Sequence, residues 1–237
     1  MLERKILVKV RLQALEHVYA QRGQPTHRAR PAVSITNFDL ESRAHICLVG
    51  SSGSGKTTLL NILAGVLVPT SGRVYLDETD LFALSEAERD ALRSRSIGCV
   101  FQTLNLLQSL SALENLTLAQ RFAGISAAQA ARRGRELLET LDLSDRADAR
   151  PSELSLGEQQ RVAIARAVSK HPGLVLADEP TASLDDENAV AAIDVLLDAC
   201  ASSTLIVVTH DARLMNRFDR VCSLDGLAGS ARGEPCA

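Results

Sequence analysis

A run of glycines and serines ending in lysine and threonine has the composition of a phosphate-binding loop. The run is Gly50, Ser51, Ser52, Gly53, Ser54, Gly55, Lys56 and Thr57. It fits the pattern G-x-x-x-x-G-K-[ST], follows an apolar run over residues 46–49 and precedes a helix-like stretch over residues 58–67. A chance Gly/Ser-rich turn is the alternative, but the strand before it and the helix after it are the context that the motif requires.

The loop's residue types indicate what it would bind. Glycines let successive backbone N–H groups close around phosphate oxygens, and a following helix presents its positive end to the anion. Lys56 would reach the β- and γ-phosphates of a nucleotide, and the Thr57 hydroxyl would bind Mg²⁺. We place the neighbouring Thr58 among the nucleotide-binding residues as well.

Two consecutive carboxylates provide a second candidate for chemistry. Asp178 and Glu179 follow the apolar run 174–177. Mg²⁺ prefers hard oxygen ligands and keeps several waters, so Asp178 is suited to hold it through a water shell. Glu179 would then orient or deprotonate the water that attacks the γ-phosphate. The alternative is a solvated acidic turn before Pro180.

Four apolar runs end on residues able to do chemistry, which indicates a shared sheet edge. Residues 46–49 lead to Gly50, 97–101 to Gln102, 174–177 to Asp178, and 205–209 to His210. Continuous apolar runs favour parallel strands covered on both faces, and ligands bind beyond the carboxyl ends of such strands. We expect His210 to contact the γ-phosphate, although a lone histidine is often structural. We expect Gln102 to contact Mg²⁺ or the attacking water.

The remaining pattern predicts one α/β domain with two additions. Alternation at Ile6, Val8, Val10 and Leu12, a polar loop over 21–31 and a second strand over 33–40 predict a small antiparallel β lobe within residues 1–41. Residues 42–102 and 159–225 would form the core. Apolar residues at helical spacing over 127–143, ended by Pro151, predict an inserted α-helical subdomain over 103–158, and 226–237 form a tail.

One further motif points to a family. Leu154-Ser155-Leu156-Gly157-Glu158 resembles the ABC transporter signature, usually Leu-Ser-Gly-Gly-Gln, and it precedes the Asp178-Glu179 strand as in that family. The resemblance covers nearly the whole chain, since Tyr19 fits the aromatic that stacks on adenine, Gln102 the Q-loop, residues 183–185 the D-loop and His210 the switch histidine. It implies a RecA-like P-loop NTPase fold that binds ATP and Mg²⁺ and hydrolyses ATP.

The resemblance also implies a dimer. Ser155 and Gly157 open a helical stretch over 158–169, which offers a second helix N-terminus for an anion. In the family this end meets the γ-phosphate held by the other subunit, so two ATP molecules are clamped between head-to-tail monomers. Ser155, Gly157, Glu158 and the D-loop Asp185 are therefore expected to bind nucleotide across the interface. Leu156 departs from the family by replacing the first glycine.

The segments 101–107 and 151–153 and the Glu158-Gln159-Gln160 variant look like the branch that serves lipoprotein release and macrolide-type or haem-type export. Its members pair with a membrane permease, which implies a peripheral location on the cytoplasmic face of the inner membrane. The leucines of 104–116 would line a groove for that partner or form the core of the helical subdomain. The alternatives are a soluble ABC ATPase of cell division or DNA repair, and a P-loop kinase, which would lack the signature.

Composition narrows the partners further. The 237 residues carry a net charge of −3, only 3% aromatic residues and no Trp, so nucleic acid is not an expected partner. Five scattered cysteines show no spacing typical of a zinc site, and no apolar run is long enough to cross a bilayer. We therefore expect a homodimer or heterodimer of ATPase subunits that acts on a separate membrane protein. The transported substrate and its direction of travel are not indicated.

Overall fold

The computed structural model describes residues 8–19 and 31–227, and its centre is a parallel sheet. The strand order is β6 (Ile97–Val100), β7 (Leu174–Asp178), β8 (Thr204–Thr209), β3 (His45–Val49) and β9 (Val221–Ser223), with every neighbouring pair parallel. The four apolar runs identified in the sequence form β3, β6, β7 and β8. The sheet edge that they predicted is therefore confirmed.

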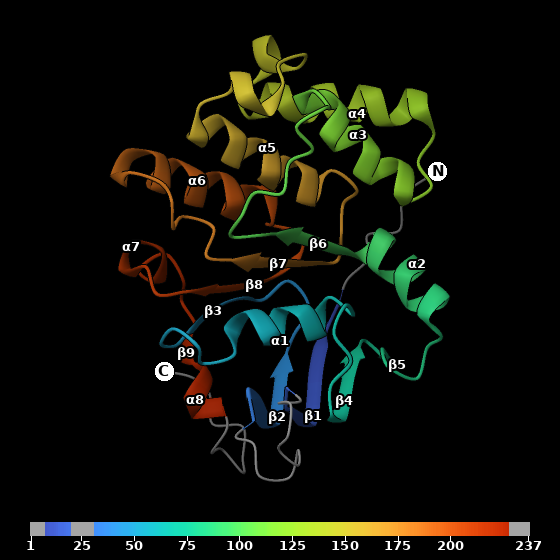
Figure 1. Ribbon diagram of the computed structural model, residues 1–237, viewed down its shortest axis with the longest axis vertical. Helices are drawn as coiled ribbons and strands as arrows, with labels where there is room; N and C mark the ends of the chain where they lie inside the picture. The colour runs from blue at the N-terminus through green and yellow to red at the C-terminus, as the bar shows by residue number, and fades with distance from the viewer. Residues whose placement is uncertain (1–7, 20–30, 228–237) are drawn as a thin grey trace.

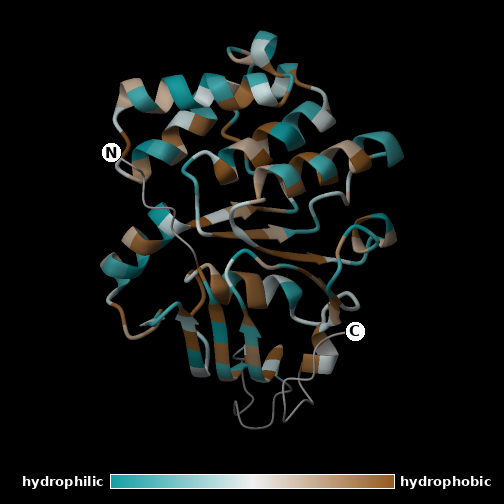
Figure 2. Ribbon diagram, turned by 180° about the vertical axis from the view of Figure 1, so that it is seen from behind, coloured by the Kyte–Doolittle hydropathy of each residue, from teal (hydrophilic) through white to brown (hydrophobic). Residues whose placement is uncertain are grey.

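Helices cover both faces of this sheet, which explains why its strands are apolar without alternation. Helix α1 (Lys56–Leu63) lies on one face, and α5 (Leu156–Val168) and α6 (Asp186–Ala199) lie on the other (Figure 1). Along β7, Leu176 packs in the cluster that contains α1, whereas Val175 and Ala177 pack in the cluster that contains α5 and α6. Figure 2 shows the corresponding brown, hydrophobic residues along the strands.

A second, antiparallel sheet lies against the α1 side of the molecule. Its order is β2 (Val33–Leu40), β1 (Val10–His17), β4 (Ser71–Leu76) and β5 (Thr79–Asp80). The sheet is thus not formed by residues 1–41 alone, because β4 and β5 come from beyond the phosphate loop. Gly72 makes the approach of β4 possible, since a Cβ there would lie 2.2 Å from the carbonyl oxygen of Ala14. Residues 20–30, most of the predicted polar loop, and Ile6 lie outside the described residues.

The helical layer contains α3 (Ala112–Phe122), α4 (Ala127–Thr140) and two short 3₁₀ helices, η2 (Ser144–Arg146) and η3 (Pro151–Glu153). Helix α4 ends at Thr140, and Asp142 then adopts a positive φ of 55°, which turns the chain. The expectation that Pro151 ends this helix was wrong, because Pro151 begins η3. Helix α2 (Glu86–Ser96) and the short α7 (Ala212–Met215) and α8 (Leu224–Leu227) complete the helices that the structure describes.

The leucines of residues 104–116 belong mainly to the hydrophobic core of the helical layer. Leu106, Leu113 and Leu116 are buried in a cluster with Val162 and Ala163 of α5, whereas Leu107 is 46% exposed. This cluster fixes the helical layer against α5. No helix among the described residues is long and apolar enough to span a membrane.

Candidate active site

The phosphate loop connects β3 to α1, and glycine is required at its end. Gly55 is the N-cap of α1 with a φ of 93°, and a Cβ there would lie 1.9 Å from the carbonyl oxygen of Ala32. The loop therefore closes tightly against the start of β2. Lys56 is 9% exposed and its Nζ donates to the carbonyl oxygens of Gly50 at 2.7 Å and Ser51 at 3.0 Å.

A cavity of about 600 Å³ opens beside this loop and collects most of the residues selected from sequence. Its lining includes Tyr19, Ala32, Gly50, Ser51, Ser52, Gly53, Gly55, Lys56, Thr57, Thr58, Gln102, Asp178, Glu179 and His210. Four separate strands of the parallel sheet thus deliver side chains to one site. Ser54 does not line this cavity, and its buried Oγ has no hydrogen-bond partner among the residues that the structure describes.

Asp178, the last residue of β7, is 7% exposed. Burial raises the pKa of its carboxyl, whereas a hydrogen bond with the Thr57 side chain and the nearby Lys56 charge act in the opposite direction. A buried carboxylate that faces a cavity beside a hydroxyl is a site where a cation would relieve an electrostatic cost.

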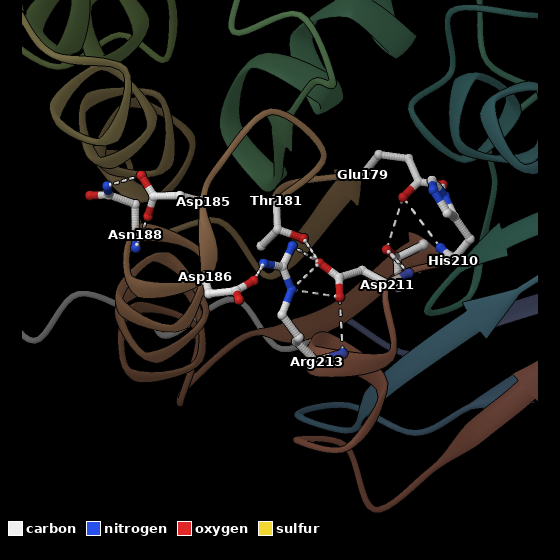
Figure 3. Close-up of polar contacts among 9 residues, drawn as sticks. Glu179, Thr181, Asp185, Asp186, Asn188, His210, Asp211 and Arg213 are labelled. Atoms are coloured by element: carbon white, nitrogen blue, oxygen red, sulfur yellow. Dashed lines mark hydrogen bonds and ion pairs between the residues drawn. The ribbon is translucent and has the colours of Figure 1, made fainter.

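Glu179 lies just past the strand and is held by donors from β8 and from the residue that follows it. The Thr209 hydroxyl donates to Oε2 at 2.8 Å, and the His210 backbone N–H reaches the same oxygen at 3.3 Å. The His210 ring Nδ1 is 2.7 Å from Oε1 (Figure 3). Lys56 Nζ is 4.0 Å from the same oxygen. Glu179 also has a positive φ of 46°, a strained conformation typical of functional sites. The carboxylate is therefore positioned on both oxygens.

Tyr19 also lines the cavity and contacts two neighbouring side chains. Its hydroxyl is 3.1 Å from Thr58 Oγ1, and its ring contacts His17 edge-on at 4.7 Å between centroids. Tyr19 as a whole remains 52% exposed, which leaves a surface on which a planar base can stack.

The signature residues lie elsewhere in the monomer. Ser155 is the N-cap of α5, and its hydroxyl accepts from the Glu158 N–H while the Glu158 carboxylate accepts from the Ser155 N–H at 2.7 Å. Arg146 Nε also donates to Glu158 at 3.1 Å. The helix thus begins at Leu156, two residues earlier than the sequence indicated. Leu156 is 45% exposed, so its side chain extends outward from the first turn.

Gly157 and Asp185 meet through one side chain. Asp185 caps α6 by accepting from the Asn188 N–H at 2.9 Å and its Nδ2 at 2.8 Å, as drawn in Figure 3. A Cβ on Gly157 would lie 2.4 Å from Asn188 Oδ1. Ser155, Gly157, Glu158 and Asp185 do not line the phosphate cavity of their own chain.

Sequence reasoning missed a polar network beside His210. Arg213 donates to both oxygens of Asp211 and to Asp186 at the start of α6, and the Thr181 hydroxyl donates to Asp211 at 2.7 Å (Figure 3). These contacts lower the pKa of Asp211 to about 2, chiefly through Arg213. The network joins the segment after His210 to the segment after Glu179. The spacing of Asp211 and Arg213 was its one local signal.

Comparison with known proteins decides the family. The profile described as "ABC transporter" matches residues 33–182, a stretch that includes the phosphate loop, the signature and the two carboxylates. This chain belongs to the ABC transporter family. The predicted P-loop fold, with its antiparallel lobe and helical part, is confirmed, and the chain is an ATP-binding ATPase subunit of this family.

Individual relatives cover most of the chain. It is 44% identical to an ABC transporter ATP-binding protein of Mycobacterium tuberculosis (strain ATCC 25618 / H37Rv) over 199 residues, 83% of this chain and 80% of that protein. It is 42% identical to the lipoprotein-releasing system ATP-binding protein LolD of Saccharophagus degradans over 200 residues, 84% of this chain and 88% of LolD.

A solved structure agrees with these relatives. The dimeric post-hydrolysis state of the ATP-binding cassette MJ0796, bound to ADP and Pi, superposes with a TM-score of 0.83 at 33% identity. The superposition covers 96% of this chain and 99% of the MJ0796 chain. The similarity therefore extends over the whole fold, including both sheets.

Proposed function

We propose that this chain is the ATP-hydrolysing subunit of an export system of the lipoprotein-release type, in which it drives a separate membrane permease. The observation that carries the proposal is the 600 Å³ cavity, where the phosphate loop, Asp178, Glu179, Gln102 and His210 meet. Relatives at about 40% identity that are named LolD support the type of system.

The cation site is assigned to Asp178, Thr57 and Gln102. Among the described residues there is no group of three or more His, Cys, Asp and Glu side chains able to hold a metal ion. A cation here would thus depend on one carboxylate, a hydroxyl and phosphate oxygens, which is the ligand set that Mg²⁺ accepts. Bound Mg²⁺ would neutralise charge on the β- and γ-phosphates.

Each remaining side chain has a distinct role. Lys56 would leave the loop carbonyls and reach toward the phosphates, and the loop N–H groups would bind them. Glu179 would accept a proton from the attacking water, with His210 and Thr209 holding its carboxylate in place. Tyr19 would stack on the base, since its ring is exposed but anchored to Thr58.

Dimerisation follows from the separation between the two groups of predicted nucleotide-binding residues. Ser155, Gly157, Glu158 and Asp185 lie outside their own phosphate cavity, so they would complete the cavity of a second subunit. The N-terminus of α5 would face the partner's γ-phosphate. The head-to-tail arrangement is compatible with either a homodimer or a heterodimer. The dimeric state of MJ0796 supports this arrangement.

The permease would dock at a separate cavity of about 780 Å³ between α2, α3 and α5. Its lining includes Phe101 and Phe122, which are 39% and 72% exposed, together with Arg95 and Lys170. An apolar helix with acidic residues would complement it. Such docking would hold the chain on the cytoplasmic face of the inner membrane.

The test is ATP turnover by the purified chain and two variants. Wild type should release phosphate from Mg-ATP, Glu179→Gln should bind ATP with turnover reduced at least about a hundredfold, and Lys56→Met should weaken ATP binding by about 10- to 100-fold. Turnover that survives Glu179→Gln unchanged would contradict the assignment of the base.

A further inference from the structure

Arg166 of α5 donates hydrogen bonds to the backbone of the segment that follows Gln102, residues 103–107. Its Nη2 donates to the carbonyl oxygen of Leu104 at 2.8 Å, and its Nη1 donates to that of Asn105 at 2.5 Å. Figure 1 shows this segment leaving β6 and running beside α5 to reach α3. The two hydrogen bonds therefore join parts of the chain that are 61 and 62 residues apart.

The segment 103–107 has a defined conformation. Asn105 adopts a positive φ of 51°, and the Thr103 hydroxyl donates to its side-chain oxygen at 3.1 Å. Two adjacent carbonyls therefore face one guanidinium at a point where the backbone turns. A planar guanidinium matches this pair of acceptors, whereas an ammonium would bind as a point charge.

Arg166 is partly buried, so its hydrogen bonds to the two carbonyls must be well aligned. Burial lowers the pKa of the Arg166 guanidinium, and no ion pair to a carboxylate is found for it within residues 8–19 and 31–227. A partly buried cation whose acceptors are carbonyls depends on good geometry for its stability. Arg166 therefore constrains where the segment can lie relative to α5.

The two segments that Arg166 joins each lead to a group of predicted nucleotide-binding residues. Gln102 lines the phosphate cavity and lies two residues before Leu104. Helix α5 carries Arg166 near its end and Ser155 at its N-cap. A helix moves as a rigid element. A shift of residues 103–107 would therefore move Arg166 and, with it, the N-terminus of α5 that would face a second subunit.

We propose that Arg166 is a positioning residue for Gln102, and that it couples the position of Gln102 to that of α5. This inference rests on the proposed function, since it takes Gln102 to act on the cation or the attacking water. Arg166 itself does not contact the phosphate cavity; it acts through the carbonyls of Leu104 and Asn105.

A double-mutant cycle with Arg166→Lys and Gln102→Ala tests the coupling. Arg166→Lys should lower kcat for ATP by about tenfold and change KM for ATP less than about twofold, because the residue places Gln102 without binding substrate. If Arg166 acts through Gln102, the double variant should have a kcat within about twofold of Gln102→Ala alone. Arg135→Lys, an exposed arginine of α4, is the matched control and should match wild type.

Hydrogen exchange of the nucleotide-free protein provides a readout independent of activity. Arg166→Lys should speed amide exchange in residues 103–107 and leave α1 unchanged. A second pair of variants approaches the same contact from the loop. Asn105→Ala strains the positive φ and should reproduce both effects, whereas Asn105→Gly tolerates it and should retain the slow exchange.

The outcomes separate this inference from the proposed function. Multiplying kcat losses in the double variant, or unchanged exchange in residues 103–107, would overturn the role of Arg166. A wild-type chain without ATP turnover would instead refute the proposed function, and the exchange data would still decide whether Arg166 holds the segment.

Discussion

Replacing Thr209 with valine tests how the Glu179 carboxylate is held. Thr209 is fully buried, and its hydroxyl donates to Glu179 at 2.8 Å while accepting from the Asp211 N–H at 3.0 Å. Valine has nearly the same shape, so the substitution removes two hydrogen bonds without opening a cavity. A hydrogen bond to a charged group contributes about 1.5–3 kcal/mol and a neutral one about 1 kcal/mol. We expect the free energy of unfolding to fall by about 2.5–4 kcal/mol.

Thermal unfolding with a matched control measures this loss. For a chain of this size the expected fall in Tm is roughly 5–15 °C. Thr209→Ser keeps the hydroxyl and loses only a methyl group, which costs about 1 kcal/mol. The valine variant should also lower kcat, since Glu179 loses a donor that orients it. Equal stability of the two variants would refute the reasoning that Thr209 anchors the carboxylate.

Three further predictions concern the loop, the signature and the polar network. Lys56→Met should weaken ATP binding by about 10- to 100-fold in Kd, measured by calorimetry, because a charge-assisted hydrogen bond contributes about 1.5–3 kcal/mol. Gly157→Ala should lower Tm by displacing Asn188, and Asn188→Ala in the same chain should restore part of the loss; no recovery would argue against this clash. Arg213→Gln should destabilise the protein most above about pH 5. The pKa of Asp211 is about 2 in the fold against an ordinary value of 3.8, so its contribution is complete above about pH 5 and is lost as the pH falls toward 2. Melting curves from pH 2 to 7 should therefore converge for wild type and variant at the acidic end.

The chemistry at the sheet edge was predictable because its signals are local. Each of Gly50, Asp178 and His210 directly follows an apolar run, and parallel strands bring their carboxyl ends to one edge. The phosphate loop and the carboxylate pair are also contiguous in sequence, so no long-range contact had to be inferred.

The antiparallel sheet was only half predictable. Residues 71–76 begin with Ser71 and Gly72, which indicate a turn rather than a strand. They pair with β1 because Gly72 lets the two backbones approach at Ala14. That pairing joins residues 55 to 66 positions apart, and no local pattern carries it.

The contacts that position the site residues were not predictable. Two examples depend on how α5 packs in the helical layer. They are the hydrogen bonds from Arg166 to the carbonyls of residues 104 and 105, and the hydrogen bond from Arg146 to Glu158. Patterns of single residues give the type of an element but not the side-chain geometry between elements. The cap at Ser155 was predictable because its partner lies three residues away.

Size-exclusion chromatography of Glu179→Gln, with and without Mg-ATP, is the most direct test of an ATP site shared between two subunits. Loss of the proposed base should leave ATP bound and uncleaved, so that Ser155 and Gly157 of each subunit complete the other's phosphate cavity. We expect a monomer without nucleotide and a dimer with Mg-ATP. A chain that binds ATP but remains a monomer would contradict the shared site, and the exposed Leu156 at the start of α5 would be the first residue to replace with glycine.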